Sequence, residues 1–287
     1  MNRRTSTSEF TVFLIAVAFL FFGCSKEDIY AFFHPKDNPP TDTSSWNLVF
    51  EDEFDDLSSW NIWYGGAFNN EIQLYREEQL SIDNSILTIN AQRASVSGPT
   101  DPYNDTPKDF EYVSGRIESQ QLFGPSDEEG ESEYRFMARI KLPNGHGMWP
   151  AFWSYGDPWP TQGEIDILEA RGGEPDVFQS NIFYGTSPNV NINQNTEAVH
   201  SVGQDLTEDF HVYEMIWREN SIEILFDEAL IYTYTANSDN NISNLFGKEQ
   251  KIVLNTAVGG FFFPDQDSSN YADSASMEID WVRVYKR

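Results

Sequence analysis

Short runs in which apolar and polar residues alternate recur along the chain from Trp46 to its end. The clearest cover residues 85–91, 134–142, 221–226, 231–235, 251–257 and 277–285. Alternation with a period of two puts every second side chain on one face of a strand, and no long stretch with the helical period of 3.6 interrupts the series. The pattern predicts an all-β domain over residues 46–287, built as a sandwich of antiparallel strands.

Segments rich in turn-forming residues separate these runs. They cover residues 97–109, 124–132, 186–196 and 237–244, and one short helix is expected near residues 241–246. No internal repeat and no domain boundary is visible within 46–287, so we expect a single domain there.

The chain of 287 residues is strongly acidic, with 46 Asp and Glu against 18 Lys and Arg and a formal net charge of −28. Nucleic-acid binding relies on Lys and Arg that release counterions from phosphates, so this charge argues against a nucleic-acid partner. It favours a well-solvated monomer. Aromatic residues make up 15% of the chain, which suits a strand-rich core or a cleft that stacks on flat ligands. The single cysteine excludes an intramolecular disulfide.

The N-terminus looks like a targeting segment rather than part of the fold. Arg3 and Arg4 precede an apolar run over residues 10–22, which is too short to span a bilayer comfortably. The run ends at Gly23-Cys24, which resembles a bacterial lipoprotein box. We therefore expect a signal peptide over 1–23, and an acylated Cys24 that begins a flexible tether over 24–45. The anchor would hold the domain at the cell envelope, on the outer membrane. An ordinary secretory signal with an incidental cysteine is the alternative.

Three acidic residues stand close together in the segment 163–169 (GEIDILE). Glu164 and Asp166 are two apart and share one face of a strand, whereas Glu169 would point to the other face of a regular strand. One inserted residue, a β-bulge, would return Glu169 to the face of the other two. Three crowded carboxyl groups repel one another, so we expect one to stay protonated near neutral pH while another ionises.

A tryptophan cluster lies just upstream, in the segment 147–153 (GMWPAFW) and at Trp159. Tryptophan rings stack against the apolar faces of pyranose rings, so such a cluster beside a carboxylate row is what a sugar cleft requires. Glycoside hydrolysis needs one carboxylate that attacks the anomeric carbon and one acid that protonates the leaving oxygen. The alternatives are ordinary surface acids and tryptophans packed in the core.

The segment Glu164-Ile-Asp-Ile-Leu-Glu169 matches the Glu-x-Asp-x-x-Glu motif of glycoside hydrolase family 16, and the chain resembles the laminarinase-like branch of that family. The resemblance extends across nearly all of 46–287. Further matching segments are 50–54 (FEDEF), 69–73 (NNEIQ), 114–117 (SGRI), 148–153 (MWPAFW), 209–213 (DFHVY), 254–260 (LNTAVGG) and 280–285 (DWVRVY).

The resemblance implies a concanavalin-like β-jelly-roll sandwich of two antiparallel sheets, with an open cleft for a polysaccharide. It implies an endo-acting retaining hydrolase in which Glu164 is the nucleophile, Glu169 the general acid/base, and Asp166 a partner of Glu164. Substrate-binding residues carried over from the motifs are Asn69, Glu71, Arg116, Trp149, Trp153 and Asn255. No cofactor is required for catalysis, although Glu53 and Asp280 match the places of a structural calcium site in some members.

Two departures from the family pattern bear on the substrate. Phe183 stands where a histidine is expected near the leaving-group side, and the run 261–263 (FFF) stands where a tryptophan is common. We expect these changes to make the cleft more apolar. A β-1,3- or mixed-linkage glucan is the expected substrate. The same chemistry on a galactan or a mucin-type O-glycan, and a surface glycan-binding protein without turnover, remain open.

Overall fold

The computed structural model describes residues 45–128 and 131–287, and Trp46–Arg287 forms one compact unit. The predicted signal peptide, Cys24 and the tether up to residue 44 lie outside the described residues. Within the described part of the chain, no helix is long and apolar enough to cross a membrane.

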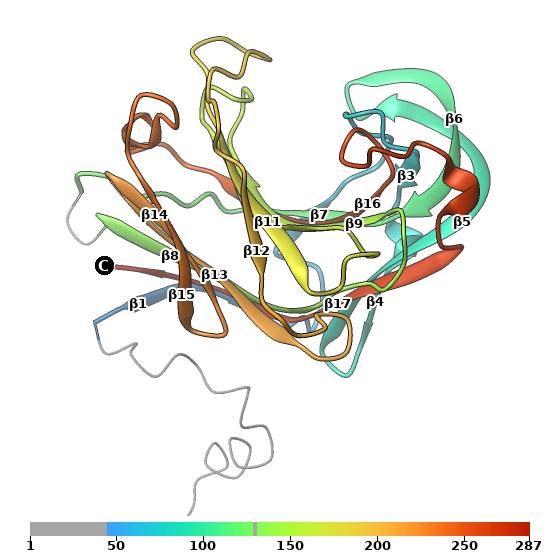
Figure 1. Cartoon of the computed structure of the whole chain (residues 1–287), viewed down its shortest axis with the longest axis horizontal. Coiled ribbons are helices and arrows are strands. Elements are labelled where there is room, and N and C mark those ends of the chain that lie inside the picture. Colours follow the sequence, from blue (N-terminus) through green and yellow to red (C-terminus); the bar gives the residue numbers. More distant parts are fainter. Residues whose placement is uncertain (1–44, 129–130) are drawn as a thin grey trace, which may run out of the picture. The chain divides into compact units, whose positions relative to one another are not determined.

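Two sheets make up the domain (Figure 1). The larger, ten-stranded sheet has the order β15-β14-β13-β8-β17-β5-β6-β3, and β1 and β4 pair with β17 and β5. Its strands are β1 (Asn47–Asp52), β3 (Gln73–Tyr75), β4 (Leu80–Asp83), β5 (Ile86–Asp101), β6 (Asn104–Ser114), β8 (Glu133–Lys141), β13 (His211–Arg218), β14 (Ser221–Phe226), β15 (Ala229–Thr235) and β17 (Ser274–Lys286).

The smaller, seven-stranded sheet has the order β12-β11-β10-β9-β16-β7-β2. Its strands are β2 (Trp60–Ile62), β7 (Arg116–Ser119), β9 (Met148–Tyr155), β10 (Glu164–Ala170), β11 (Val177–Phe183), β12 (Ala198–Ser201) and β16 (Lys251–Val258). Every pairing in the two sheets is antiparallel except β3 with β6, which is parallel. The predicted fold class, a jelly-roll sandwich, is therefore confirmed, with one parallel pair added.

The main core lies between the two sheets, because the alternating strands turn their apolar side chains inward from both. Leu87 and Ile89 of β5 are fully buried in it, as are Phe152 of β9 and Ile165 of β10. Trp217 of β13 is the largest fully buried side chain among those the structure describes. This core leaves the opposite face of β9, β10 and β16 free to form a binding surface, since neighbouring side chains along a strand alternate between faces.

Each of the predicted strands is present, but the prediction of a turn-rich segment between strands over 97–109 is wrong. β5 and β6 continue through it as a long hairpin, and the turn falls only at residues 102–103. The Ser, Pro, Asp and Asn of this segment favour turns, yet two bulges in the β5–β6 pairing absorb them. The short helix expected near 241–246 is present as the 3-10 helix η2 (Ile242–Asn244).

Candidate active site

A cleft of about 640 Å³ lies over the seven-stranded sheet. Its walls include all three acids of the predicted row, Glu164, Asp166 and Glu169. They also include every residue that the sequence nominated for substrate binding: Asn69, Glu71, Arg116, Trp149, Trp153 and Asn255. The fold thus brings together side chains from five strands or loops that lie far apart in the sequence.

The three acids share one face because β10 contains a bulge. Asp166 lies opposite Trp153 of β9, but the next pair joins Leu168 to Phe152, so β10 has one more residue than its neighbour. Ile167 and Leu168 are consequently both fully buried in the core. The extra residue turns Glu169 back toward the cleft, which is the arrangement that the sequence predicted.

Burial and mutual repulsion raise the pKa of all three carboxyl groups. For Glu164 the largest cause is the loss of water, followed by the repulsion of Glu169. Asp166 is more completely buried and faces both neighbours, so its pKa lies well above the ordinary value. Loss of water also dominates for Glu169, with added repulsion from Glu197 and Glu71. Such a row holds at least one proton at neutral pH, as the sequence predicted.

Each outer acid of the row receives a hydrogen bond from an indole. Trp159 Nε1 donates to Glu164 Oε2 at 2.9 Å, and Trp149 Nε1 donates to Glu169 Oε1 at 2.8 Å. These bonds fix the rotamers of the two carboxyl groups and stabilise their ionised forms. The sequence predicted the tryptophans as sugar platforms, and the structure adds this second role.

Behind Trp149 lies a stack of flat groups. The ring of Phe262 is parallel to Trp149 with centroids 4.5 Å apart, and the guanidinium of Arg171 covers the other face of Phe262 at 4.0 Å. Arg171 also donates two hydrogen bonds to the carbonyl oxygen of Phe262. Because Arg171 follows β10 directly, the strand that carries Glu169 also holds the loop that supports Trp149.

The phenylalanines that were expected to make the cleft more apolar lie beside residues of its wall. Among the described residues that line the cleft, neither Phe183 nor the 261–263 run is included. Phe183 lies against Trp159, with ring centroids 6.3 Å apart, and Phe263 is buried. Phe183 is the cross-strand partner of Glu164 and Phe261 is 73% exposed, so the effect of these rings on the cleft stays a prediction.

Arg116 of β7 is held between two tryptophans. Its guanidinium lies 3.9 Å from the ring centre of Trp63 and 4.9 Å from that of Trp153. Glu118, two residues along the same strand, accepts its Nη2 hydrogen at 2.6 Å. Sequence reasoning missed Trp63 and Glu118; the one signal for Glu118 was its i, i+2 spacing from Arg116, which puts both on one strand face.

A hydrogen-bonded chain links the floor of the cleft. Asn255 Oδ1 accepts the Trp153 indole hydrogen at 2.7 Å, and its amide nitrogen donates to the Tyr75 hydroxyl at 3.1 Å. Gln73 Nε2 donates a hydrogen bond to the Glu71 carboxyl group at 2.7 Å. Burial raises the pKa of Glu71 to about 7, although Gln73 and Arg116 oppose the shift. Polar groups bonded in this way are fixed in place before substrate arrives.

The loop that carries Asn69 and Glu71 depends on two features of the sequence. Asn69 has φ 57°, in the left-handed region that asparagine tolerates better than most residues. Gly260 has φ 75°, and a Cβ there would lie only 2.7 Å from the Asn69 carbonyl oxygen. The glycine therefore lets the two loops approach closely and sets Glu71 at the cleft.

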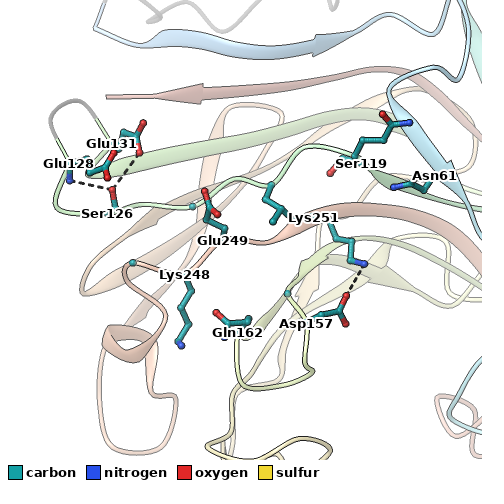
Figure 2. Close-up of a pocket in the computed structure, with 15 residues that line it drawn as sticks. Asn61, Ser119, Ser126, Glu128, Glu131, Asp157, Gln162, Lys248, Glu249 and Lys251 are labelled. Carbon is teal, nitrogen blue, oxygen red and sulfur yellow. Dashed lines mark hydrogen bonds and ion pairs between the residues drawn. The ribbon is translucent and has the colours of Figure 1, made fainter. Parts of the chain in front are cut away.

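A second concavity of about 650 Å³ adjoins the cleft at the ends of β7, β9 and β16 (Figure 2). Asp157 lies on the wall of both, and its carboxylate pairs with Lys251 Nζ at 3.0 Å. Lys251 also bonds Glu118 at 3.0 Å. Through Lys251, these ion pairs connect Glu118, the partner of Arg116, to Asp157 on the wall of the cleft.

The two residues named for calcium are each paired with an arginine. Glu53 Oε1 accepts a hydrogen bond from Arg283 Nη2 at 2.6 Å, and Asp280 pairs with Arg139. In the described ranges no group of three or more His, Cys, Asp or Glu is placed to hold a metal ion. Calcium takes six to eight oxygen ligands, which backbone carbonyls and water can supply in part, so the calcium site stays a prediction in which the ion would compete with the two arginines.

The domain is a two-sheet sandwich, and its cleft places tryptophans around a row of buried carboxyl groups. This combination is typical of enzymes that cleave sugar chains with a pair of carboxyl groups. Comparison with known proteins gives the particular family. Residues 69–283 match the family model of glycosyl hydrolases family 16, and the chain belongs to that family.

Relatives and solved structures agree with this assignment. The chain is 31% identical to glucan endo-1,3-beta-glucosidase A1 of Niallia circulans, over 86% of this chain and 39% of the relative. It is 30% identical to the keratan-sulfate endo-1,4-beta-galactosidase of Sphingobacterium multivorum, over 85% and 56%. The chain thus spans about two fifths to just over half of the length of these curated relatives. The endo-beta-1,3-glucanase structure from Pyrococcus furiosus superimposes with a TM-score of 0.68 at 30% identity, covering 84% and 94% of the two chains.

Proposed function

We propose that this protein is an endo-acting retaining glycoside hydrolase that cleaves β-1,3- or mixed-linkage β-1,3/1,4-glucan by double displacement. The observation that carries the proposal is the row of three buried carboxyl groups on the bulged strand β10, inside a tryptophan-lined cleft. A cleft built on one sheet face, with walls from several loops, is suited to a chain that continues beyond the bond being cut.

The family motif supports the roles of the two outer acids, with Glu164 as the nucleophile and Glu169 as the general acid/base. Burial and the charge of Glu169 raise the pKa of Glu164 to about 8, and burial raises that of Glu169 to about 7, so the two groups share a proton near neutral pH and Arg116 offsets only part of the shift at Glu164. In the first step the Glu164 carboxylate attacks the anomeric carbon and the Glu169 proton moves to the leaving oxygen, so the glycosidic bond breaks as the glycosyl–enzyme bond forms.

The second step reverses these roles. Glu169, now ionised, takes a proton from water, and the resulting oxygen attacks the anomeric carbon and releases Glu164. Asp166, whose pKa burial and its two acidic neighbours raise well above the ordinary value, holds its proton beside Glu164 and moderates the charge on the nucleophile. Two inversions at one carbon give net retention.

The choice of glucan rests on the glucanase relative and on the glucanase neighbour in structure. A β-linked galactan remains a second candidate, because the chain is nearly as similar to a relative described as a galactosidase. Mucin-type O-glycans belong to the same alternative. A pure glycan-binding protein is disfavoured, since binding alone has no need for three mutually repelling acids.

The testing experiment is a reducing-end assay of the domain on laminarin, mixed-linkage glucan, agarose, carrageenan and mucin O-glycans. We expect short oligosaccharides from the first two. Release from a galactan or mucin alone would replace the substrate and keep the chemistry. Binding without release on every substrate would favour the glycan-binding alternative.

Azide rescue tests the roles of the two acids. We expect Glu164→Ala to be rescued by azide with a glycosyl azide of inverted configuration, because azide can take the place of the missing nucleophile. We expect Glu169→Gln to lose about 10²- to 10⁴-fold in turnover while it still binds substrate. An inverted product from a Glu169 variant, with none from Glu164→Ala, would reverse the assignment.

We also propose that the full chain is a monomeric lipoprotein of the outer membrane, anchored through Cys24. The lipoprotein-like sequence at Gly23-Cys24 supports this proposal. Mass spectrometry of the membrane fraction should find an acylated N-terminal Cys24, and Cys24→Ser should release the enzyme from membranes. A soluble protein cleaved elsewhere would contradict it.

A further inference from the structure

The wall of the cleft also carries two exposed aromatic rings that the sequence did not nominate. Phe68 and Tyr103 both line it, in the same continuous hollow as the three acids. Phe68 is 55% exposed and Tyr103 is 75% exposed. Large exposed rings at the end of a binding cleft are unusual without a ligand, because apolar surface left in water is costly.

Tyr103 is carried by the long β5–β6 hairpin, which rises at one edge of the molecule (Figure 1). The hairpin is held in place where Gly66 N donates to the Pro99 carbonyl oxygen at 3.0 Å. A Cβ on Gly66 would lie 2.3 Å from the Thr100 carbonyl oxygen, so only glycine allows this approach. The Asp101 carboxylate accepts the Tyr103 backbone N–H at 2.8 Å and shapes the turn.

A line of contacts joins this end of the cleft to the reaction centre. The rings of Tyr103 and Trp63 meet at 88° with centroids 6.3 Å apart, and Trp63 stacks on Arg116, which in turn lies over Trp153. Trp63 directly follows β2, which is four strands from β10 in the sheet. At roughly 4.8 Å per strand spacing, that is about 19 Å from the carboxylate row, a span of several sugar units.

From these placements we propose that Phe68 and Tyr103 are stacking platforms for sugar units beyond the one held at the three acids, with Phe68 beside Asn69 and Tyr103 farther out, next to Trp63. The inference rests on the proposed function, because it places a further unit of the same polysaccharide. The ligand is an uncharged sugar ring, whose apolar face lies on the aromatic rings. Asp101 and Asn104, which line the same end, supply polar groups for its hydroxyls. The hairpin thereby makes affinity depend on chain length.

Binding to a ladder of β-1,3-linked gluco-oligosaccharides tests the subsite. Calorimetry would use the Glu164→Gln protein, in which the chain stays intact, from the disaccharide to the octasaccharide. We expect Tyr103→Ala and Phe68→Ala each to weaken binding of the longest oligosaccharides by roughly fivefold to tenfold. The loss should shrink as the chain shortens, and Tyr103→Phe should keep the affinity for long chains.

Tyr64→Ala is the matched control. Tyr64 is 58% exposed and neighbours Trp63, but it lies outside the wall of the cleft. Equal affinities for Tyr103→Ala, Phe68→Ala and Tyr64→Ala at every length would overturn the subsite. If the parent enzyme cleaves a galactan instead of glucans, the glucan proposal fails, and the same ladder made from that galactan decides on the subsite. Absence of any length-dependent loss there would also overturn it.

Discussion

Trp149 combines two tasks at one position. Its ring belongs to the cleft wall, and its indole N–H holds the carboxyl group of Glu169 at 2.8 Å. The Phe262 ring and the Arg171 guanidinium stacked behind it limit how far the indole can move. Trp149 therefore affects both substrate binding and proton transfer. A substitution of Trp149 changes both, and only the pH profile of the variant distinguishes the two effects.

We predict that Trp149→Phe shifts the alkaline limb of kcat/KM to higher pH. The hydrogen bond from Trp149 stabilises the ionised form and so lowers the pKa of Glu169, and its loss raises that pKa. Because Glu169 must be protonated for the first step, activity then persists to higher pH. A profile that is only scaled down, with an unmoved alkaline limb, would show that Trp149 acts through binding alone.

At the scale of elements, the site depends on close contacts between loops. The loop over residues 69–71 approaches Gly260, and the hairpin of β5 and β6 approaches Gly66. In both cases a backbone carbonyl occupies the space of a missing Cβ. Positions of this kind fix the cleft walls before substrate binds, which limits the entropy lost on binding.

We predict that Gly260→Ala lowers the free energy of unfolding more than Gly203→Ala does. Both glycines have φ near +70°, at 75° and 70°, so an alanine at either should cost about 1 kcal/mol of stability for its left-handed backbone. Only at Gly260 does the new Cβ meet the Asn69 carbonyl, whereas Gly203 has open space around it. Gly260→Ala should therefore also lower kcat/KM. Equal stability losses and equal activity in the two variants would refute this.

Across the whole molecule, the cleft acids lower stability as the pH rises. The pKa values of Glu71, Glu164, Asp166 and Glu169 are raised in the folded protein, so the folded state holds more protons than the unfolded chain. Stability is greatest below the ordinary carboxyl pKa and is lost as the pH rises through the folded values. Burial lowers the pKa of His200 to about 4. Below the ordinary histidine pKa, this residue makes stability rise with pH and so opposes the effect of the acids.

We therefore predict that the free energy of unfolding falls from about pH 4.5, where the unfolded carboxyl groups ionise, to about pH 8, and that His200 offsets only part of this fall below about pH 6.5. Glu164→Gln should flatten this slope and raise stability at pH 8, because it removes one of the buried groups that must ionise. Denaturant unfolding at several pH values measures both effects. A slope that rises with pH, or one unchanged by Glu164→Gln, would contradict the assignment of raised pKa values.

Chelation provides a further test on the whole domain. Since Glu53 pairs with Arg283 and Asp280 with Arg139, we predict that EDTA changes neither the activity nor the unfolding midpoint. Added Ca²⁺ should likewise have no effect on the midpoint. A clear drop in the midpoint after chelation, reversed by Ca²⁺, would show that the ion displaces the arginines.

By itself, the sequence determined the local features of this protein. Alternation in the segments of β8, β14, β16 and β17 predicted the sandwich, because a strand with one buried face repeats every two residues. The spacing of Glu164, Asp166 and Glu169 predicted a bulge, and every substrate-binding residue that the matching motifs nominated lies on the wall of the cleft.

Only the tertiary structure decided which side chains face one another. It put Phe262 behind Trp149 and Glu118 beside Arg116, and it gave Glu53 and Asp280 arginine partners. It also turned the predicted loop over 97–109 into a hairpin that brings Tyr103 to the cleft. Period and spacing describe one strand at a time, whereas stacking, ion pairing and the shape of a cleft depend on segments that meet only when the sheets close over the core.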